Sequence, residues 1–487
     1  MESFVFSATT QCVLSFFDQI NRFPRCSGNE IALANWMLQW ANKEGFSSYK
    51  DTAGNVIIHV PATKGYENIP PVILQGHLDM VCEKTPESSH NFSADPIINI
   101  IDGDWLHAKD TSLGADNGLA IAIIMALVTT SEIEHGPIEI LLTVEEETGM
   151  RGASELIADS LHGRFLLNLD SEDEGVFTIG CAGGQDTRFQ LSLTIENTTI
   201  QHEALQIKVQ NLRGGHSGID IHQGSANAIL LVARFLQQLS KTEKIQLVAF
   251  EGGSAKNAIP RDCMAIITGS KEAIFAALKF ASAYQDKIQA QFKKTDPYLS
   301  FSASKTDPSS HHVPAEKTRT ILSFVNEIPH GAISMCVDMP QTVETSTNLA
   351  VVSLTTTHLD IWTSQRSCVP KKLSELVDSI QQIGQKYRAH ISSQHKYPPW
   401  TPNFKSSLLA LCTDTYRSLF GREASIKTIH AGLECSILGE KLQGLDMISF
   451  GPTLKHAHSP NECLQISSID AVFQFLKELL KSFKKMV

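Results

Sequence analysis

The stretch VILQGHLDMVCEK at residues 72–84 decides the fold class. Its apolar run, Val72 to Leu74, is short and continuous, as in a strand that is buried on both faces of a parallel sheet. His77 and Asp79 follow this run directly, although a buried strand needs neither side chain. A metal site can use both, because imidazole nitrogens and carboxylate oxygens bind divalent ions. The stretch therefore predicts a buried strand that ends beside a metal.

Apolar runs of the same kind alternate with helical patterns along the chain. The runs lie at 138–144, 165–169 and 447–450, and the helical patterns include 117–129 and 151–159. Ser27 and Glu30 have the spacing of a capping box, which predicts a helix that ends near Gly45. Its predicted core-facing residues are Ile31, Ala34, Trp36 and Leu38. This alternation predicts an α/β domain with a mixed sheet that is flanked by helices.

The middle of the chain has a different pattern. Alternating stretches such as 188–193 are followed by helical patterns at 225–240, 272–293 and 372–389, which indicates an α+β domain. The Gly- and Pro-rich segments CAGGQ (181–185) and YPPWTP (397–402) have the composition of hinges. We therefore predict a discontinuous catalytic domain, 1–186 and 399–487, and an inserted lid and dimerisation domain, 187–398.

Composition narrows the class of protein. A chain of 487 residues with 42% apolar and 19% charged residues is typical of a globular enzyme with more than one domain. A net charge of -11 argues against a nucleic-acid partner. The start, MESFVFSATT, has no basic segment of a secretory signal, and the longest apolar run, 119–128, is too short to span a membrane. Ten cysteines without CxxC spacing predict reduced thiols and a cytoplasmic protein.

Polar residues follow each predicted strand. The acidic triplet 145–147 comes after Val144, Asp170 ends the run at 165–169, and His458 follows the run at 447–450 after a short loop. Asp116 opens the helical pattern at 117–129. Ligands of open α/β sheets bind at the carboxyl ends of the strands. We therefore expect these side chains to converge.

The charges of these residues suit a pair of divalent ions. Asp116, Glu147 and Asp170 supply three negative charges, two Zn²⁺ supply four positive ones, and a bound hydroxide balances the sum. Glu146 would then be free to act as general base. Spacing alone leaves ordinary alternatives open, because an Asp before a helix is commonly an N-cap and an acidic triplet is commonly a solvated turn.

Nine segments carry a resemblance to a known family. They are, in order, GHLDMV, LGADNG, EEETG, NLDSEDEG, CAGG, GGHSG, NAIPR, HAGLE and GPT..HAHSP. This set resembles the aminoacyl-histidine dipeptidases, which are cytosolic dinuclear-zinc dipeptidases akin to carnosinases and aminoacylases. The resemblance runs from about Pro24 to Glu462, nearly the whole chain.

The resemblance implies a role for each residue of the predicted metal site. His77 and Asp170 would bind one zinc, Glu147 and His458 the other, and Asp116 would bridge the two. Asp79 would orient His77. Glu146 would activate the bridging water as general base and pass its proton to the leaving amine. A cis peptide between Asp116 and Asn117 is also implied. Mn²⁺ or Co²⁺ could replace zinc on these ligands.

The inserted domain has candidates of its own. The resemblance implies that His216 of GGHSG stabilises the oxyanion. Asn257 and Arg366 are predicted substrate contacts, and Arg366 suits the terminal carboxylate, although a structural role is an open alternative for both. His430 and Glu434 of HAGLE are predicted as further substrate contacts.

The function implied is hydrolysis of unblocked dipeptides, including Xaa-His, by a metal-activated water. Two rivals stay open: a hydrolase of N-acyl amino acids on the same fold, and a peptide- or metal-binding relative that has lost catalysis. The partners expected are a small dipeptide and a second copy in a homodimer, without nucleic acid or membrane. His216 could act in its own chain or in that of a partner.

Overall fold

The computed structural model describes residues 6–197, 202–337 and 339–486, and the chain within it forms two compact units. Unit 1 holds residues 1–181, 400–428 and 433–487, and unit 2 holds 182–399 and 429–432. These boundaries lie within a few residues of the predicted ones, except that the short segment 429–432, which contains His430, groups with unit 2.

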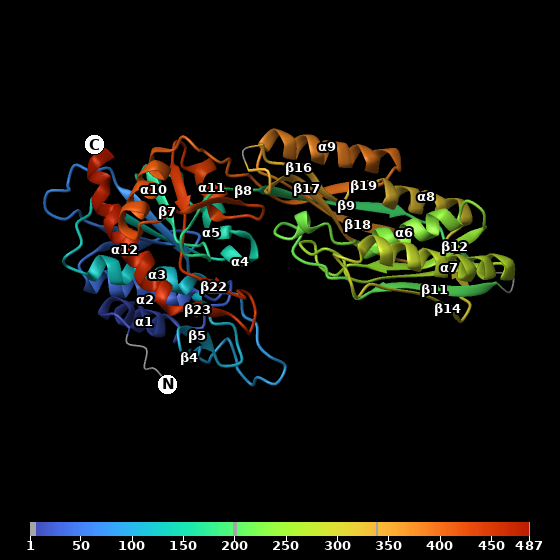
Figure 1. The fold of residues 1–487 in the computed structure, drawn as a ribbon, viewed down its shortest axis with the longest axis horizontal. Coiled ribbons are helices and arrows are strands. Elements are labelled where there is room, and N and C mark those ends of the chain that lie inside the picture. Colours follow the sequence, from blue (N-terminus) through green and yellow to red (C-terminus); the bar gives the residue numbers. More distant parts are fainter. Residues whose placement is uncertain (1–5, 198–201, 338, 487) are drawn as a thin grey trace. The chain divides into compact units, whose positions relative to one another are not determined.

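Unit 1 is built on a mixed sheet with the strand order β1-β2-β6-β3-β7-β21-β8-β20. Figure 1 labels two of its strands, β7 and β8. Strands β6, β3, β7 and β21 are parallel to their neighbours within this group, so their carboxyl ends share one edge. Strand β3 is buried at all six positions, as its apolar sequence predicts. The strand bounds are β1 Ser47–Lys50, β2 Val56–Val60, β3 Val72–His77, β6 Ile138–Thr143, β7 Phe165–Asn168, β8 Val176–Cys181, β20 Ser425–Ile429 and β21 Asp446–Ser449.

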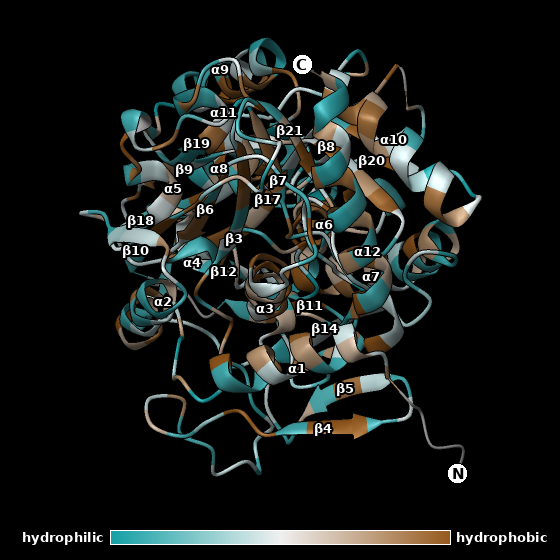
Figure 2. Cartoon of the chain, turned by 90° about the vertical axis from the view of Figure 1, so that its left-hand side faces the viewer, coloured by the Kyte–Doolittle hydropathy of each residue, from teal (hydrophilic) through white to brown (hydrophobic). Residues whose placement is uncertain are grey.

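Helices flank this sheet. Helix α3 is apolar all round and packs against β3, α1 and α12, as expected of a helix buried on every side. Helices α1 and α2 show hydrophilic and hydrophobic residues mixed along the ribbon, as in half-buried helices (Figure 2). The helix bounds are α1 Ala8–Ile20, α2 Ile31–Lys43, α3 Ala115–Thr129, α4 Glu146–Gly149, α5 Arg151–Glu155, η1 Ala158–Ser160, α10 Ser407–Phe420, α11 Glu434–Lys441, α12 Ile466–Ser482 and η3 Phe483–Met486.

A smaller sheet completes unit 1. Its order is β22-β23-β5-β4, with bounds β4 Asn99–Asp102, β5 Trp105–Ala108, β22 Leu454–Lys455 and β23 Cys463–Gln465. The pairings β22–β23, β23–β5 and β4–β5 are antiparallel, and the sheet joins the segment after β21 to the segment before α3. His458 lies between β22 and β23, and Asp116 is the second residue of α3.

Unit 2 is an antiparallel sheet packed against helices α6, α7, α8 and α9, which is the predicted α+β pattern. The order is β14-β11-β13-β12-β17-β18-β9-β19, with β16 paired to β17 and a separate β10-β15 pair. The bounds are β9 Gly183–Ser192, β10 Glu196–Asn197, β11 Glu203–Gln210, β12 Ile245–Gly252, β13 Cys263–Gly269, β14 Ser300–Thr306, β15 His311–His312, β16 Gly331–Met335, β17 Val343–Leu354, β18 His358–Ser367 and β19 His390–Tyr397. The helices are η2 Ile221–Gln223, α6 Ala228–Leu239, α7 Lys271–Phe292, α8 Ala315–Glu327 and α9 Pro370–Lys386.

The predicted capping box is wrong, although the helix it predicted exists. Helix α2 has no side-chain cap, because Ser27 Oγ donates to Asp79 Oδ2 and Glu30 Oε1 accepts from the backbone of Gly28 and Glu145. The core face also differs, since Ile31 is 66% exposed and Trp36 and Leu38 are half-buried. The residues that α2 buries are Leu33, Ala34, Met37, Trp40 and Ala41.

The prediction that all cysteines are reduced thiols is wrong for one pair. Cys26 and Cys82 form a disulfide, with Cα atoms 5.7 Å apart. Cys26 pairs with Met80 in an isolated parallel bridge, which brings two segments together that sequence spacing does not connect. Among the described residues, no helix is both long enough and apolar enough to cross a membrane.

Candidate metal centre

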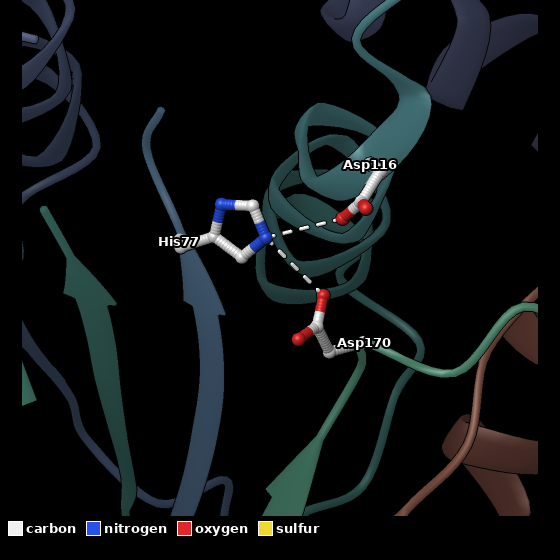
Figure 3. A group of neighbouring side chains, drawn as sticks. All are labelled: His77, Asp116 and Asp170. Atoms are coloured by element: carbon white, nitrogen blue, oxygen red, sulfur yellow. Dashed lines mark hydrogen bonds and ion pairs between the residues drawn. The ribbon is translucent and has the colours of Figure 1, made fainter. Parts of the chain in front are cut away.

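Three side chains from different elements of unit 1 converge at the shared edge of the parallel strands. His77 is the last residue of β3, Asp170 lies two residues beyond β7, and Asp116 lies at the start of α3. His77 Nε2 is 3.1 Å from Asp116 Oδ1 and 3.3 Å from Asp170 Oδ1 (Figure 3). The fold therefore brings these three predicted residues together.

The second half uses the other oxygen of Asp116. His458 Nε2 lies 3.1 Å from Asp116 Oδ2 and 3.1 Å from Glu147 Oε2. Asp116 thus faces a histidine with each carboxylate oxygen, which is the arrangement of a bridging ligand. The ligand atoms of these residues form compact groups, His77–Asp116–Asp170 and Asp116–Glu147–His458, each within 4.8 Å.

The donor set fits divalent cations. Imidazole nitrogens and carboxylate oxygens are ligands of zinc and of similar ions. Glu147 Oε1 is buried and has no hydrogen-bond partner, which a bound cation would correct. Glu146, with His77 and Glu147, forms a third such group, so its carboxylate also lies at this centre.

Burial and close charged neighbours shift the pKa values of groups in this site. Burial, together with Asp170, Glu434 and Glu147, raises the pKa of Glu146 well above its usual value. Burial is also the main reason that the pKa of Asp170 rises to about 6. Hydrogen bonds to Asp116 and Glu147 raise the pKa of His458 to about 11. The site thus concentrates negative charge that calls for compensating cations.

Asp79 connects the ligand segments to each other. Its Oδ1 is 3.3 Å from His77 Nδ1, and its two oxygens accept the backbone N–H groups of Glu146 and Glu147 at 3.0 and 3.2 Å. Ser27 Oγ donates to it at 2.7 Å. Burial alone would raise the pKa of Asp79, but these hydrogen bonds lower it. Asp79 therefore orients His77 and also holds the turn that carries Glu146.

Asn117 is a site residue that the sequence reasoning missed. Its Oδ1 accepts the backbone N–H of His77 at 3.1 Å, and its Nδ2 donates to Asp170 Oδ1 at 2.8 Å. The peptide bond between Asp116 and Asn117 is cis, as the family resemblance implies. Asn117 directly follows the bridging ligand in LGADNG, and that adjacency was the available signal.

A buried polar layer lies behind the ligands. Gln75 is two residues before His77 on β3, so both side chains are on the same face of the strand. Glu434 Oε2 accepts from Gln75 Nε2 and Thr143 Oγ1, each at 2.6 Å, and Asn168 Nδ2 donates to Gln75 Oε1 at 2.5 Å. Burial raises the pKa of Glu434 to about 8. Its Oε1 is buried and has no hydrogen-bond partner.

Unit 2 gathers predicted substrate residues of its own. His216 Nδ1 accepts the backbone N–H groups of Gly218 and Ile219 at 3.2 and 3.1 Å, which leaves the ring proton on Nε2. His430 Nε2 is 2.8 Å from Ser346 Oγ. Burial, aided by Arg366 and His216, lowers the pKa of His430 to about 3, so its ring is neutral at pH 7.

Arg366 and Asn257 belong to the same unit. Arg366 is buried, its Nη1 donates to Tyr397 Oη at 2.8 Å, and its Nε has no hydrogen-bond partner. An unpaired buried guanidinium N–H is a ready donor for a carboxylate. The Asn257 carbonyl accepts the N–H of Ser217 at 2.7 Å, which places Asn257 beside the residue that follows His216.

Comparisons with known proteins point to one family. The model of Peptidase family M20/M25/M40 matches residues 73–482. The chain is 36% identical over 471 residues to the cytosol non-specific dipeptidase of Escherichia coli (strain K12), covering 97% of each. The crystal structure of aminoacylhistidine dipeptidase from Vibrio alginolyticus is similar, with a TM-score of 0.87 and 35% identity over 98% of each chain. A tripeptidase from Staphylococcus aureus, at TM-score 0.58 and 16% identity, covers 98% of this chain and 99% of its own and shares the fold.

Proposed function

Because the chain belongs to peptidase family M20/M25/M40 and is thus a metal-dependent peptidase, we propose that it hydrolyses unblocked dipeptides, including Xaa-His, in the cytoplasm. The observation that carries the proposal is Asp116, whose two oxygens each face a histidine, with Glu146 in the same cluster. The similarity to two dipeptidases along nearly the whole chain supports the substrate class.

We assign two zinc ions to this centre. His77 and Asp170 would hold one, Glu147 and His458 the other, and Asp116 would bridge them. When bound, such ions would polarise the peptide carbonyl and lower the pKa of a bound water. Mn²⁺ or Co²⁺ would suit the same ligands.

The chain's own residues then handle the protons. Glu146 is the proposed general base: its carboxylate takes a proton from the attacking water and gives it to the nitrogen of the leaving amine. Asp79 accepts the backbone N–H of Glu146 and so fixes the start of the turn that carries the Glu146 carboxylate. Since Asp79 also orients His77, one residue aligns the base with a ligand.

Unit 2 supplies the proposed contacts to substrate. His216, with its proton on Nε2, has a donor suited to an oxyanion. Arg366 is the proposed partner of the dipeptide's terminal carboxylate, and Asn257 and His430 are further contacts, as is Glu434 of unit 1. The mass of the protein in solution tests whether it forms a homodimer. Mixing His216→Ala chains with Glu146→Ala chains then tests whether His216 serves its own chain or its partner.

A substrate panel tests the proposal and its rivals. The purified protein is given β-alanyl-His, Gly-His, Gly-Gly, Gly-Gly-His and acetyl-His, each with and without chelator. We expect cleavage of the dipeptides alone, lost with chelator and restored by zinc. Acetyl-His is the matched control, because it is Gly-His without the amine. Preference for acetyl-His would favour the N-acyl amino acid hydrolase, and no cleavage by the metal-loaded protein would favour the silent binder.

Replacing Arg366 tests the carboxylate contact. In Arg366→Lys the charge stays but the bidentate fork is lost, so we expect KM for Gly-His to rise about 10-fold or more with a smaller change in kcat. Arg319, exposed on α8, offers the control Arg319→Lys. Steady-state kinetics of both variants decide the matter, and an unchanged KM in Arg366→Lys would leave Arg366 a structural role only.

A further inference from the structure

Glu462 occupies an unusual place for a carboxylate. It is 2% exposed, and its two oxygens accept four consecutive backbone N–H groups. Oε2 accepts from Leu113 and Gly114 at 2.7 and 2.9 Å. Oε1 accepts from Ala115 and Asp116 at 2.8 and 3.2 Å. A buried carboxylate that is satisfied in this way fixes the segment it binds.

The segment that Glu462 binds carries the bridging ligand, and its own segment carries another ligand. Asp116 is the last of the four donors, and His458 is four residues before Glu462. His458 Nε2 and Asp116 Oδ2 lie 3.1 Å apart, although 342 residues separate them along the chain. Neither residue has the backbone dihedral angles of a regular α-helix. His458 has a φ of 62°, and Asp116 has non-helical dihedrals inside α3. Regular secondary structure therefore does not set their spacing.

Arg25 binds the same segment through a carbonyl group, whereas Glu462 binds it through N–H groups. It is 1% exposed, and its Nη2 donates to the carbonyl of Gly114 at 2.5 Å while its Nη1 donates to the carbonyls of Leu78 and Asp79. Gly114 thus donates its N–H to Glu462, and its carbonyl accepts a hydrogen bond from Arg25. A Cβ at position 114 would lie 2.4 Å from Arg25 Nη2, so only glycine fits, and its φ of 70° suits glycine as well.

We propose that Glu462 is a positioning residue of the metal centre: it fixes Asp116 against His458, so that the bridging carboxylate already faces both histidines before metal binds. Arg25 balances its charge and ties the same segment to the strand end that carries His77 and Asp79. Pre-organised ligands bind metal more tightly, because less ordering remains to be done on binding. This inference rests on the metal centre of the proposed function, but not on the identity of the substrate.

The test measures metal binding directly. Glu462→Gln keeps the size of the side chain but leaves one acceptor oxygen where four N–H groups need two. Cobalt(II) is titrated into metal-free wild type, Glu462→Gln, Glu462→Asp and the control Glu440→Gln, whose side chain is exposed on α11. Calorimetry gives the affinity, and visible absorption of the bound cobalt reports ligand geometry.

We expect Glu462→Gln to bind cobalt about 10- to 100-fold more weakly with an altered absorption band. Glu462→Asp, which keeps the charge, should lie between it and wild type, and Glu440→Gln should match wild type. Affinity and spectrum unchanged in Glu462→Gln would overturn the proposal, whatever happens to its melting temperature. Should Glu462→Gln not fold, Glu462→Asp with wild-type affinity and spectrum would overturn it equally. If the wild type itself binds no metal, it is the proposed function that fails.

Discussion

The Glu146→Ala variant is expected to bind zinc as tightly as wild type and to hydrolyse Gly-His at least about 1,000-fold more slowly. The reason is that Glu146 is proposed to move the proton, whereas the predicted metal ligands are other residues. The decisive measurements are kcat and zinc content on the same preparation, because loss of turnover with full metal content separates a base from a ligand.

The control for Glu146 is a carboxylate of the same stretch that lies away from the centre. Glu155 is exposed at the end of α5 and forms an ion pair with Arg151 at 3.0 Å, so Glu155→Ala should keep wild-type activity. Turnover of Glu146→Ala near that of wild type would rule out the assigned base. Loss of zinc in Glu146→Ala would instead make Glu146 a ligand, which its position near His77 and Glu147 allows.

The Asp116→Ala variant is expected to lose both activity and the paired metal site. Asp116 contacts both histidines, so its removal takes a ligand from each half of the centre at once. The remaining ligands, His77 with Asp170 and His458 with Glu147, would each hold an ion through two residues instead of three. We expect zinc affinity to fall by at least about 100-fold, since few ligands remain per ion. Calorimetric titration of the metal-free protein measures this.

The control for Asp116→Ala removes a different aspartate, so that one negative charge is lost away from the metal centre. Asp102 is exposed at the end of β4, and Asp102→Ala should bind metal and turn over like wild type. If Asp116→Ala bound two zinc ions with wild-type affinity, Asp116 would be no bridging ligand. The far-ultraviolet spectrum of the metal-free variant shows whether unit 1 has kept its fold.

The convergence of the candidate ligands could be predicted from sequence because these residues lie where strands end. His77, Asp170 and the acidic triplet each follow a run of buried apolar residues, and the rule that carboxyl ends of parallel strands share an edge brings them together. The bridging position of Asp116 needed the family resemblance, because an Asp at the start of a helix is commonly a cap. The structure places Asp116 between both histidines.

The supporting residues could not be predicted, because local rules describe them as something else. Ser27 and Glu30 satisfy the capping-box pattern, yet their side chains bind Asp79 and the backbone of Glu145 and leave α2 uncapped. Gln75 lies in an apolar run and Glu462 in a loop, and neither position has a periodic signal. Their partners are distant in sequence, up to 359 residues for Gln75 and Glu434, so only the folded chain reveals them.

The cysteine pair was missed for the same reason. Cys26 and Cys82 are 56 residues apart, and no short motif marks them. They meet because Cys26 pairs with Met80, beside the Arg25 carbonyl that accepts the N–H of Met80 at 3.1 Å. Segments that converge on the metal centre thus also bring the two thiols together.

Hydrolysis is proposed to depend on a two-metal centre formed by five side chains of unit 1: His77, Asp116, Glu147, Asp170 and His458. The most direct test of this proposal is a zinc titration of the chelator-treated protein that follows bound zinc and Gly-His hydrolysis in the same samples. We expect two ions per chain at saturation, with activity that rises as they bind and is absent at zero zinc. Full hydrolysis of Gly-His by protein without bound metal would contradict it.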